Sequence, residues 1–138
     1  MTTRAPTTAS KTSRLHVPFD ELVGLRLEHW ERGRSVVTVE RRAELTNALS
    51  TVHGAVIMAL LDAALCKAAA HSEADPVITV NLSVSFVSAA AGKLVAEGRM
   101  IRGGKSLVFC EGEVRAEDGT MVAKAVGTFK LPRSASGS

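Results

Sequence analysis

Asp62 is the single charged residue in an apolar stretch that runs from residue 54 to residue 65 and reads GAVIMALLDAAL. An ionised carboxylate there loses hydration and finds no partner within its own segment, which costs several kcal/mol. Just upstream, the segment NALSTVHG at residues 47–54 contains an amide, Asn47, and an imidazole, His53. Carboxylates and imidazoles move protons, and amide groups stabilise negative charge that develops on oxygen. The combination therefore indicates chemistry rather than packing.

Each of these residues also has an ordinary structural interpretation. Asp62 can be a buried acid that pairs with an Arg or Lys from elsewhere in the chain. Asn47 lies in a predicted loop, where Asn often stabilises turns. His53 and Gly54 both suit the start of a helix. We favour a function for Asp62, and its proximity in sequence to the polar cluster is the reason.

The main element that positions these residues is a predicted helix over residues 54–70, in which Ala, Leu and Met dominate. Because the segment is apolar on every side, we expect a central helix that is covered all round. If the helix begins at Gly54, its first free N–H groups and the positive end of its dipole lie beside His53. Such a helix start binds an oxygen that carries negative charge.

Asp62 lies eight residues beyond Gly54, which is about 12 Å along a helix axis at ~1.5 Å per residue. A general base must come within ~3 Å of its target or act through one water, so Asp62 cannot serve its own helix start. Two copies with antiparallel helices and a two-fold axis near Met58 would place Asp62 of one chain beside Gly54 of the other. The spacing therefore favours a homodimer with two shared sites.

The rest of the chain predicts one domain built mainly from strands. The segment ITVNLSVSF at residues 78–86 alternates, with apolar residues at even numbers and polar residues at odd ones, which indicates a half-buried strand. Asp118-Gly119 is a hairpin turn signal. A short helix or turn is expected at 16–23, and strands at 25–30, 35–42, 78–86, 93–102, 106–117 and 120–131. One antiparallel sheet wrapped around one helix, an α+β architecture, would satisfy every face.

The predicted domain spans residues 15–131. Residues 1–14 and 132–138 are expected to be disordered tails because they are rich in small polar residues and poor in apolar ones. The first segment, MTTRAPTTASKTSR, lacks acidic residues and loosely resembles a transit peptide, but a disordered tail is the favoured interpretation.

The charge distribution argues against nucleic acid as a partner. Four of the 17 basic residues, Arg4, Lys11, Arg14 and Arg133, lie in the terminal segments, which leaves 13 against 14 acidic residues in the body of the chain. A nucleic-acid-binding domain needs a basic stripe on its folded surface. The stretch around Asp62 is also too short and too charged to span a bilayer.

The two cysteines, Cys66 and Cys110, both lie in apolar stretches and lack a metal-ligand spacing, so we expect reduced core residues. Reduced cysteines fit a cytoplasmic protein. We expect neither a metal nor an organic cofactor.

The pattern Asn47-x5-His53-Gly54-x7-Asp62, followed by TVNLS from residue 79, resembles the hotdog-fold acyl-CoA thioesterases of the phenylacetic acid degradation type. The resemblance extends from about residue 19 to residue 129 and includes the ending VAKAVGTF. It implies a hotdog fold, in which an antiparallel sheet wraps around one long central helix. It also implies a homodimer that shares one continuous sheet, and often a dimer of dimers, that is, a homotetramer.

The same resemblance implies a role for each site residue. The Gly54 N–H and the Asn47 amide would hold the thioester oxygen, and Asp62 of the partner would activate water or attack the carbonyl carbon. His53 would orient the thioester or its leaving thiolate. Thr79 matches a hydroxyl that helps to place the water. Thr79 lies on the polar side of its strand, however, so we expect it to reach Asp62 only at an interface.

Two positions depart from the family pattern. Ala55 stands where the family commonly has a second glycine, and its methyl group would narrow the acyl pocket. Ser50 stands where a glycine is usual in the loop before His53, which puts the path of this loop in question. Neither departure removes a catalytic group.

The segment RGGKS at residues 102–106 resembles a phosphate-binding loop only superficially, because Arg99 occupies the position at which a Walker motif needs glycine. By the family resemblance, Arg102, Gly104 and Lys105 would contact the phosphates of coenzyme A. A solvated hairpin tip is an equally good interpretation.

We therefore expect a thioester hydrolase that cleaves an aryl- or medium-chain acyl-CoA to the free acid and coenzyme A. Two alternatives stay open, namely a hotdog accessory protein that binds an acyl thioester without hydrolysing it, and a hotdog dehydratase. The joint occurrence of Asn47, His53 and Asp62 favours hydrolysis.

Overall fold

The computed structural model describes residues 15–132. The two predicted tails lie outside this range except for Pro132. Within this range the short helix is α2 (Pro18–Val23) and the long helix is α3 (Gly54–Ala69). A 3-10 turn, η1 (Ala43–Leu45), lies between them in sequence. The strands are β1 (Arg26–Glu31), β2 (Arg34–Val39), β3 (Ile78–Phe86), β4 (Leu94–Gly103), β5 (Leu107–Ala116) and β6 (Met121–Lys130).

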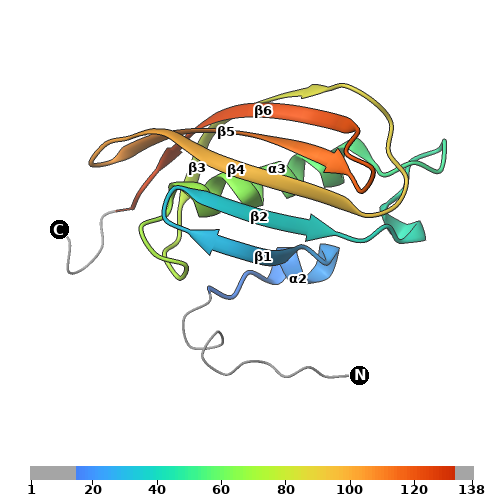
Figure 1. The fold of residues 1–138 in the computed structure, drawn as a ribbon. Coiled ribbons are helices and arrows are strands. Elements are labelled where there is room, and N and C mark those ends of the chain that lie inside the picture. The colour runs from blue at the N-terminus through green and yellow to red at the C-terminus, as the bar shows by residue number, and fades with distance from the viewer. Residues whose placement is uncertain (1–14, 133–138) are drawn as a thin grey trace.

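The six strands form one antiparallel sheet in the order β1-β2-β4-β5-β6-β3. The sheet curves around α3, which lies along its concave side (Figure 1). The α+β fold class is confirmed as a hotdog arrangement, and each predicted element is present. The predicted 35–42 strand is the least accurate, because its last three residues leave the sheet before η1.

Two glycines let α3 lie directly on the sheet. A Cβ atom on Gly98 of β4 would collide with the backbone carbonyl of Ala64, and one on Gly112 of β5 would come 2.7 Å from Leu65 Cδ1. Ser35 Oγ on β2, fully buried, donates a hydrogen bond to the same Ala64 carbonyl at 2.7 Å. The middle of α3 is therefore fixed against the centre of the sheet.

The prediction that this helix is covered all round is wrong for the single chain. Eight of its residues are buried, among them Leu60, Leu61 and Leu65. The opposite stripe is not covered, and Met58 remains 41% exposed there. The reason is geometric, because a sheet that curves around a helix from one side leaves the other side open. We call the stripe formed by Ala55, Met58, Asp62 and Cys66 the open face of α3.

β3 has the predicted bounds, but its predicted half-burial holds only in its middle, where Leu82 and Val84 are partly buried between exposed polar residues. Ile78, Val80 and Phe86 are 51%, 57% and 53% exposed, whereas Leu82 and Val84 pack only partly against the core. Among the strands of residues 15–132 it is at the edge of the sheet and pairs with β6 alone. A long apolar edge strand with unpaired backbone groups is a surface that pairs readily with another strand.

A β-bulge interrupts β3 near its start. Thr79 lies opposite Phe129 and Asn81 lies opposite Thr128, so Val80 has no partner in the ladder. Because one extra residue reverses which side of the sheet the following residues face, the strict alternation of the sequence does not continue in space. Thr79 therefore lies on the same side of the sheet as the buried Phe129.

Candidate active site

Asp62 lies half-buried on the open face of α3, and its partners are neutral. Thr79 Oγ1 donates a hydrogen bond to Asp62 Oδ1 at 2.6 Å, and Cys66 Sγ lies 3.9 Å from the same oxygen. No Arg, Lys or His forms an ion pair with Asp62 among the residues that the structure describes. The alternative interpretation, a structural acid neutralised by a cation of its own chain, is therefore not what residues 15–132 show.

The contact between Thr79 and Asp62 lies within one chain, which corrects the expectation that only an interface would bring them together. The prediction failed because it extended the alternation of β3 through Val80, where the ladder is bulged. The bulge turns the Thr79 hydroxyl toward α3 and leaves Val80 in solvent. A hydroxyl that donates to one carboxylate oxygen fixes the orientation of the carboxylate and leaves the second oxygen available.

His53 is the N-cap of α3. Its Nδ1 atom accepts a hydrogen bond from the backbone N–H of Ala55 at 2.9 Å. The helix-start interpretation of His53 is therefore correct, but the cap uses only one of the two ring nitrogens. With Nδ1 occupied as an acceptor, the neutral imidazole carries its proton on Nε2, on the side away from the helix. His53 can thus cap the helix and still donate to a ligand.

Gly54 is the first residue of α3. Within the described part of the chain its backbone N–H has no acceptor, as expected for the first turn of a helix. The ring of Phe86 lies alongside, because a Cβ built on Gly54 would be 3.5 Å from Phe86 Cε1. An unoccupied N–H at the positive end of a helix, next to an apolar wall, is a suitable site for a carbonyl oxygen that becomes negative.

Asn47 organises the loop that leads to this helix. Its Oδ1 atom accepts hydrogen bonds from the backbone N–H groups of Leu49 and Thr51 at 2.9 and 3.2 Å, and from Thr51 Oγ1 at 3.1 Å. The turn-forming interpretation of Asn47 is therefore correct. The three bonds fix the amide so that its NH₂ group, which has no acceptor among the described residues, is the end left for a ligand.

Ser50 has a backbone conformation that bears on the path of this loop. Its φ is 65°, in the left-handed region that favours glycine. A position with this φ suits glycine, which fits the glycine that is usual there in the family, and Ser50 adopts it at the cost of some backbone strain.

In one chain, the candidate residues form two separate groups. Asp62, Thr79 and Cys66 form one group in the middle of α3, whereas Asn47, His53 and Gly54 surround its first turn. Asp62 lies eight positions after Gly54, which keeps the groups about 12 Å apart along the axis.

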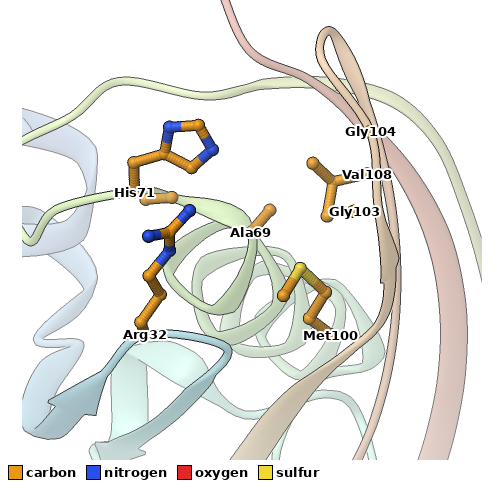
Figure 2. A pocket seen from close by; sticks show the side chains of 8 residues that line it. Arg32, Ala69, His71, Met100, Gly103, Gly104 and Val108 are labelled. Carbon is orange, nitrogen blue, oxygen red and sulfur yellow. The ribbon is translucent and has the colours of Figure 1, made fainter.

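The hairpin residues Arg102, Gly104 and Lys105 lie elsewhere. Arg102 and Lys105 are exposed, and the β4–β5 hairpin meets the C-terminal end of α3 at Ala69, opposite to the end that carries His53. A cavity of about 200 Å³ lies there, between the hairpin and the β1–β2 turn. Figure 2 shows Arg32 and His71 on one side of it and Met100 and Val108 on the other. Neither candidate group lines this cavity.

Sequence reasoning missed two neighbours of Asp62. Cys66 is one helical turn beyond it, and this i, i+4 spacing was available as a signal. Asp20 on α2 carries no such signal. Burial raises the pKa of Asp20, and the positive charge of Lys67 lowers it while the negative charge of Asp62 raises it. These charges show that α2 lies within electrostatic reach of the middle of α3.

Two further features of residues 15–132 concern ligands and membranes. In this range, no three His, Cys, Asp or Glu residues are grouped as a metal site would require. None of the described helices combines the length and apolarity that a membrane crossing demands.

Comparison with known proteins identifies the family. The model of the Thioesterase superfamily matches residues 49–123, more than half of the chain and the part that contains α3 and β3. The chain therefore belongs to the Thioesterase superfamily, which agrees with the hotdog fold.

Individual relatives are distant. The Saccharolobus solfataricus protein SSO2140, provisionally named an esterase, is 28% identical over 116 residues and 83% of each chain. The medium/long-chain acyl-CoA thioesterase YigI of Salmonella typhimurium is 24% identical over 134 residues, 84% of this chain and 86% of its own. The structure of the E. coli PaaI protein from the phenylacetic acid degradation operon superposes with a TM-score of 0.76 at 20% identity, over 83% of each chain. The family and the first two relatives support a thioester hydrolase. The PaaI structure supports the fold, and the phenylacetic acid type is only one of several similar groups.

Proposed function

We propose that this protein is an acyl-CoA thioesterase that hydrolyses an aryl- or medium-chain acyl-CoA to the free acid and coenzyme A. The observation that carries the proposal is the environment of Asp62, a half-buried carboxylate that accepts a hydrogen bond from a hydroxyl and lies 3.9 Å from a thiol. A carboxylate that no cation binds is available to interact with a water molecule or a substrate. The membership in the Thioesterase superfamily and the similarity to an acyl-CoA thioesterase support the same chemistry.

In the proposed reaction, the carbonyl carbon of the thioester is attacked by water that Asp62 activates, or by Asp62 itself. The carbonyl oxygen gains negative charge, which the Gly54 N–H and the Asn47 NH₂ group stabilise. His53 donates from Nε2 toward the thioester or the leaving thiolate, and Thr79 holds Asp62 in place. One oxyanion donor is worth about 10²–10³ in rate, and a general base about 10²–10⁴.

The proposal includes a homodimer, because neither group of residues is a complete site alone. Antiparallel pairing of two α3 helices about an axis near Met58 joins Asp62 of one chain to Gly54 of the other. Two features support this pairing. The open face of α3 is apolar around Asp62, and β3 offers an exposed apolar edge that can continue the sheet into a second copy.

We also propose a dimer of dimers, with the outer side of the sheet as the second interface. Leu107, Phe109 and Val126 are exposed on β5 and β6. We further propose a cytoplasmic location, which is consistent with two free cysteines.

The proposal is tested with a panel of acyl-CoA thioesters, in which a chromogenic thiol reagent reports the release of coenzyme A. We expect wild-type protein to hydrolyse at least one aryl- or medium-chain substrate and Asp62→Ala to hydrolyse none. Tight binding without release would overturn the proposal in favour of an acyl-thioester-binding protein. Hydration of an enoyl-CoA in place of hydrolysis would indicate a dehydratase.

The shared site is tested by mixing two inactive variants. Asp62→Asn and Asn47→Ala each damage a different half of the site, and in a mixed dimer both defects fall in one site while the other is intact. Subunit exchange should therefore restore about a quarter of the wild-type activity, since about half of the dimers are mixed. If no mixture exceeds the parent variants, or if the active species is a monomer, the shared site is wrong.

Coenzyme A binding by the hairpin is tested with the double variant Arg102→Gln, Lys105→Gln. We expect a higher KM with little change in kcat, because the two cations would bind the phosphates equally in the ground state and the transition state. An unchanged KM would show that Arg102 and Lys105 do not bind coenzyme A and that the hairpin tip is simply solvated.

A further inference from the structure

Cys66 completes a chain of three polar groups on the open face of α3. Cys66 Sγ lies 3.3 Å from Thr79 Oγ1, and Thr79 Oγ1 lies 2.6 Å from Asp62 Oδ1. Asp62 and Cys66 are one turn apart on the same rigid helix, so their side chains lie on one face. Thr79 comes from the edge strand β3, directly before the bulge at Val80.

The number of hydrogens fixes the direction of the two bonds. A hydroxyl group has one hydrogen to donate. Thr79 uses this hydrogen in its 2.6 Å bond to Asp62, because a carboxylate only accepts. Hydrogen bonds to a charged acceptor are also characteristically short. The thiol has one hydrogen and two oxygen neighbours, and Thr79 Oγ1 at 3.3 Å is closer than Asp62 Oδ1 at 3.9 Å, so we assign its S–H to Thr79 Oγ1. The direction then runs from Cys66 to Thr79 to Asp62.

The thiol keeps the hydrogen that this role requires. Burial raises the pKa of Cys66 to about 12, and the negative charge of Asp62 acts in the same direction. The hydrogen bond between Cys66 and Thr79 and the charge of Lys67 lower this pKa, and the charge of Cys110 raises it. At neutral pH Cys66 is thus a neutral donor and not a nucleophile.

We propose that Cys66 is a positioning residue for hydrolysis at Asp62, holding the Thr79 hydroxyl so that Thr79 donates to Oδ1 and Oδ2 is left to act on water. The inference rests on the proposed thioesterase function and adds a residue to it. The Thr79 hydroxyl needs a second contact because Thr79 lies on a bulged edge strand, which is less constrained than the centre of a sheet. A second contact from α3 ties the hydroxyl to the helix that carries the carboxylate.

The test compares three substitutions on a substrate that the wild type hydrolyses. Cys66→Ala and Cys66→Val both remove the hydrogen-bond donor. Cys66→Ala also reduces the side-chain volume, whereas Cys66→Val approximately keeps it. We expect kcat to fall about five- to tenfold in both, with KM within about twofold, as loss of one positioning hydrogen bond predicts. Cys66→Ser keeps a donor and should stay within about twofold of the wild-type kcat. Cys110→Ala is the matched control, because Cys110 is a buried thiol on β5 with no contact to Asp62.

A double-mutant cycle with Thr79→Val separates positioning from a general packing effect. If Cys66 acts through Thr79, Cys66→Ala should have no further effect on kcat once the hydroxyl is gone. Equal effects in both backgrounds would overturn the inference, and so would a wild-type kcat in Cys66→Ala or a loss in Cys66→Ser as large as that in Cys66→Val. If the wild type hydrolyses the substrate and Asp62→Asn does not, any of these contrary results refutes only the positioning role of Cys66. If the wild type does not hydrolyse any substrate, the proposed function itself fails.

Discussion

Asp62 on α3 is half-buried and Glu113 on β5 is buried, and the two carboxylates are held in different ways. Arg99 of β4 donates two hydrogen bonds to Glu113, at 2.6 and 3.0 Å, in a bidentate pair. Asp62 receives one hydroxyl hydrogen bond and the weak contact of a thiol. Glu113 is therefore a structural acid whose charge is neutralised, whereas Asp62 keeps a charge that is oriented but not cancelled. The difference is what separates a carboxylate that stabilises the fold from one available for chemistry.

The largest expected effect is on activity. Asp62→Asn should lower kcat by about 10²–10⁴, because the amide cannot act as base or nucleophile. Glu113→Gln should leave kcat within a few-fold of the wild type. Thioester hydrolysis by the two purified variants provides the measurement. A similar loss of activity in both would remove the distinction between the carboxylates.

The second effect is on stability. Here Glu113→Gln should have the larger effect and Asp62→Asn the smaller one. Glu113→Gln weakens two charge-assisted bonds to Arg99, so the free energy of unfolding should fall by about 1–3 kcal/mol. Asp62→Asn should leave it unchanged or raise it slightly, since a charge kept for catalysis is a cost to the fold. Urea denaturation of both variants measures this. A clear destabilisation by Asp62→Asn would indicate that Asp62 is structural after all.

The pH dependence of stability sharpens the same contrast. The hydrogen bonds from Arg99 lower the pKa of Glu113 below that of an unfolded glutamate, which is about 4.3. The stabilisation from this pair is therefore complete above the unfolded pKa and is lost as the pH falls through the lower folded value. Unfolding free energies between pH 7 and pH 3 should fall more steeply in the wild type than in Glu113→Gln. Parallel curves would show that the pair contributes little.

A smaller effect concerns the reactivity of Cys66. Its pKa is raised to about 12 chiefly by burial and then by the charge of Asp62, whereas that of Cys110 is raised to about 12 by burial alone. Asp62→Asn should therefore increase alkylation of Cys66 at pH 9, on the order of a few-fold. Mass spectrometry of both cysteines in one sample gives the ratio, with Cys110 as the internal control. An unchanged ratio would mean that Asp62 exerts no charge effect on its neighbour.

The smallest expected effect is at Ser50, in the loop that Asn47 organises. Ser50→Gly should raise the free energy of unfolding by about 0.5–1 kcal/mol, because relief of the left-handed backbone outweighs the extra freedom of the unfolded chain. Thermal unfolding measures the change, and Ser72→Gly, at an exposed site after α3, is the control. A loss of stability in Ser50→Gly would argue that the serine side chain has a favourable role of its own.

Much of the fold could be predicted because local patterns determine it. The Ala- and Leu-rich composition of residues 54–69 places the helix and its first residue, Gly54, and the turn signals at 103–104 and 118–119 delimit the last three strands. Burial was less predictable. Met58 and Val80 are apolar, and nothing in their segments indicates that the single chain leaves them exposed.

The candidate site was predicted in its residues but not in its contacts. Asp62 was identifiable because a charge in an apolar helix is costly, and the resemblance supplied Asn47, His53 and Thr79. The bond between Thr79 and Asp62 was not predictable within one chain, since no residue type marks the bulge. Cys66 was overlooked because a cysteine in an apolar helix is usually a core residue.

The bulge in β3 has a consequence for how this edge strand aligns during folding. The nine letters from Ile78 to Phe86 would also fit a straight ladder, in which Ile78 and Val80 point inward and the threonine hydroxyl is lost to solvent. Apolar burial alone favours that slipped alignment. The hydroxyl bond to Asp62 opposes it, so the acid on the helix also helps to select which of two pairings the strand adopts.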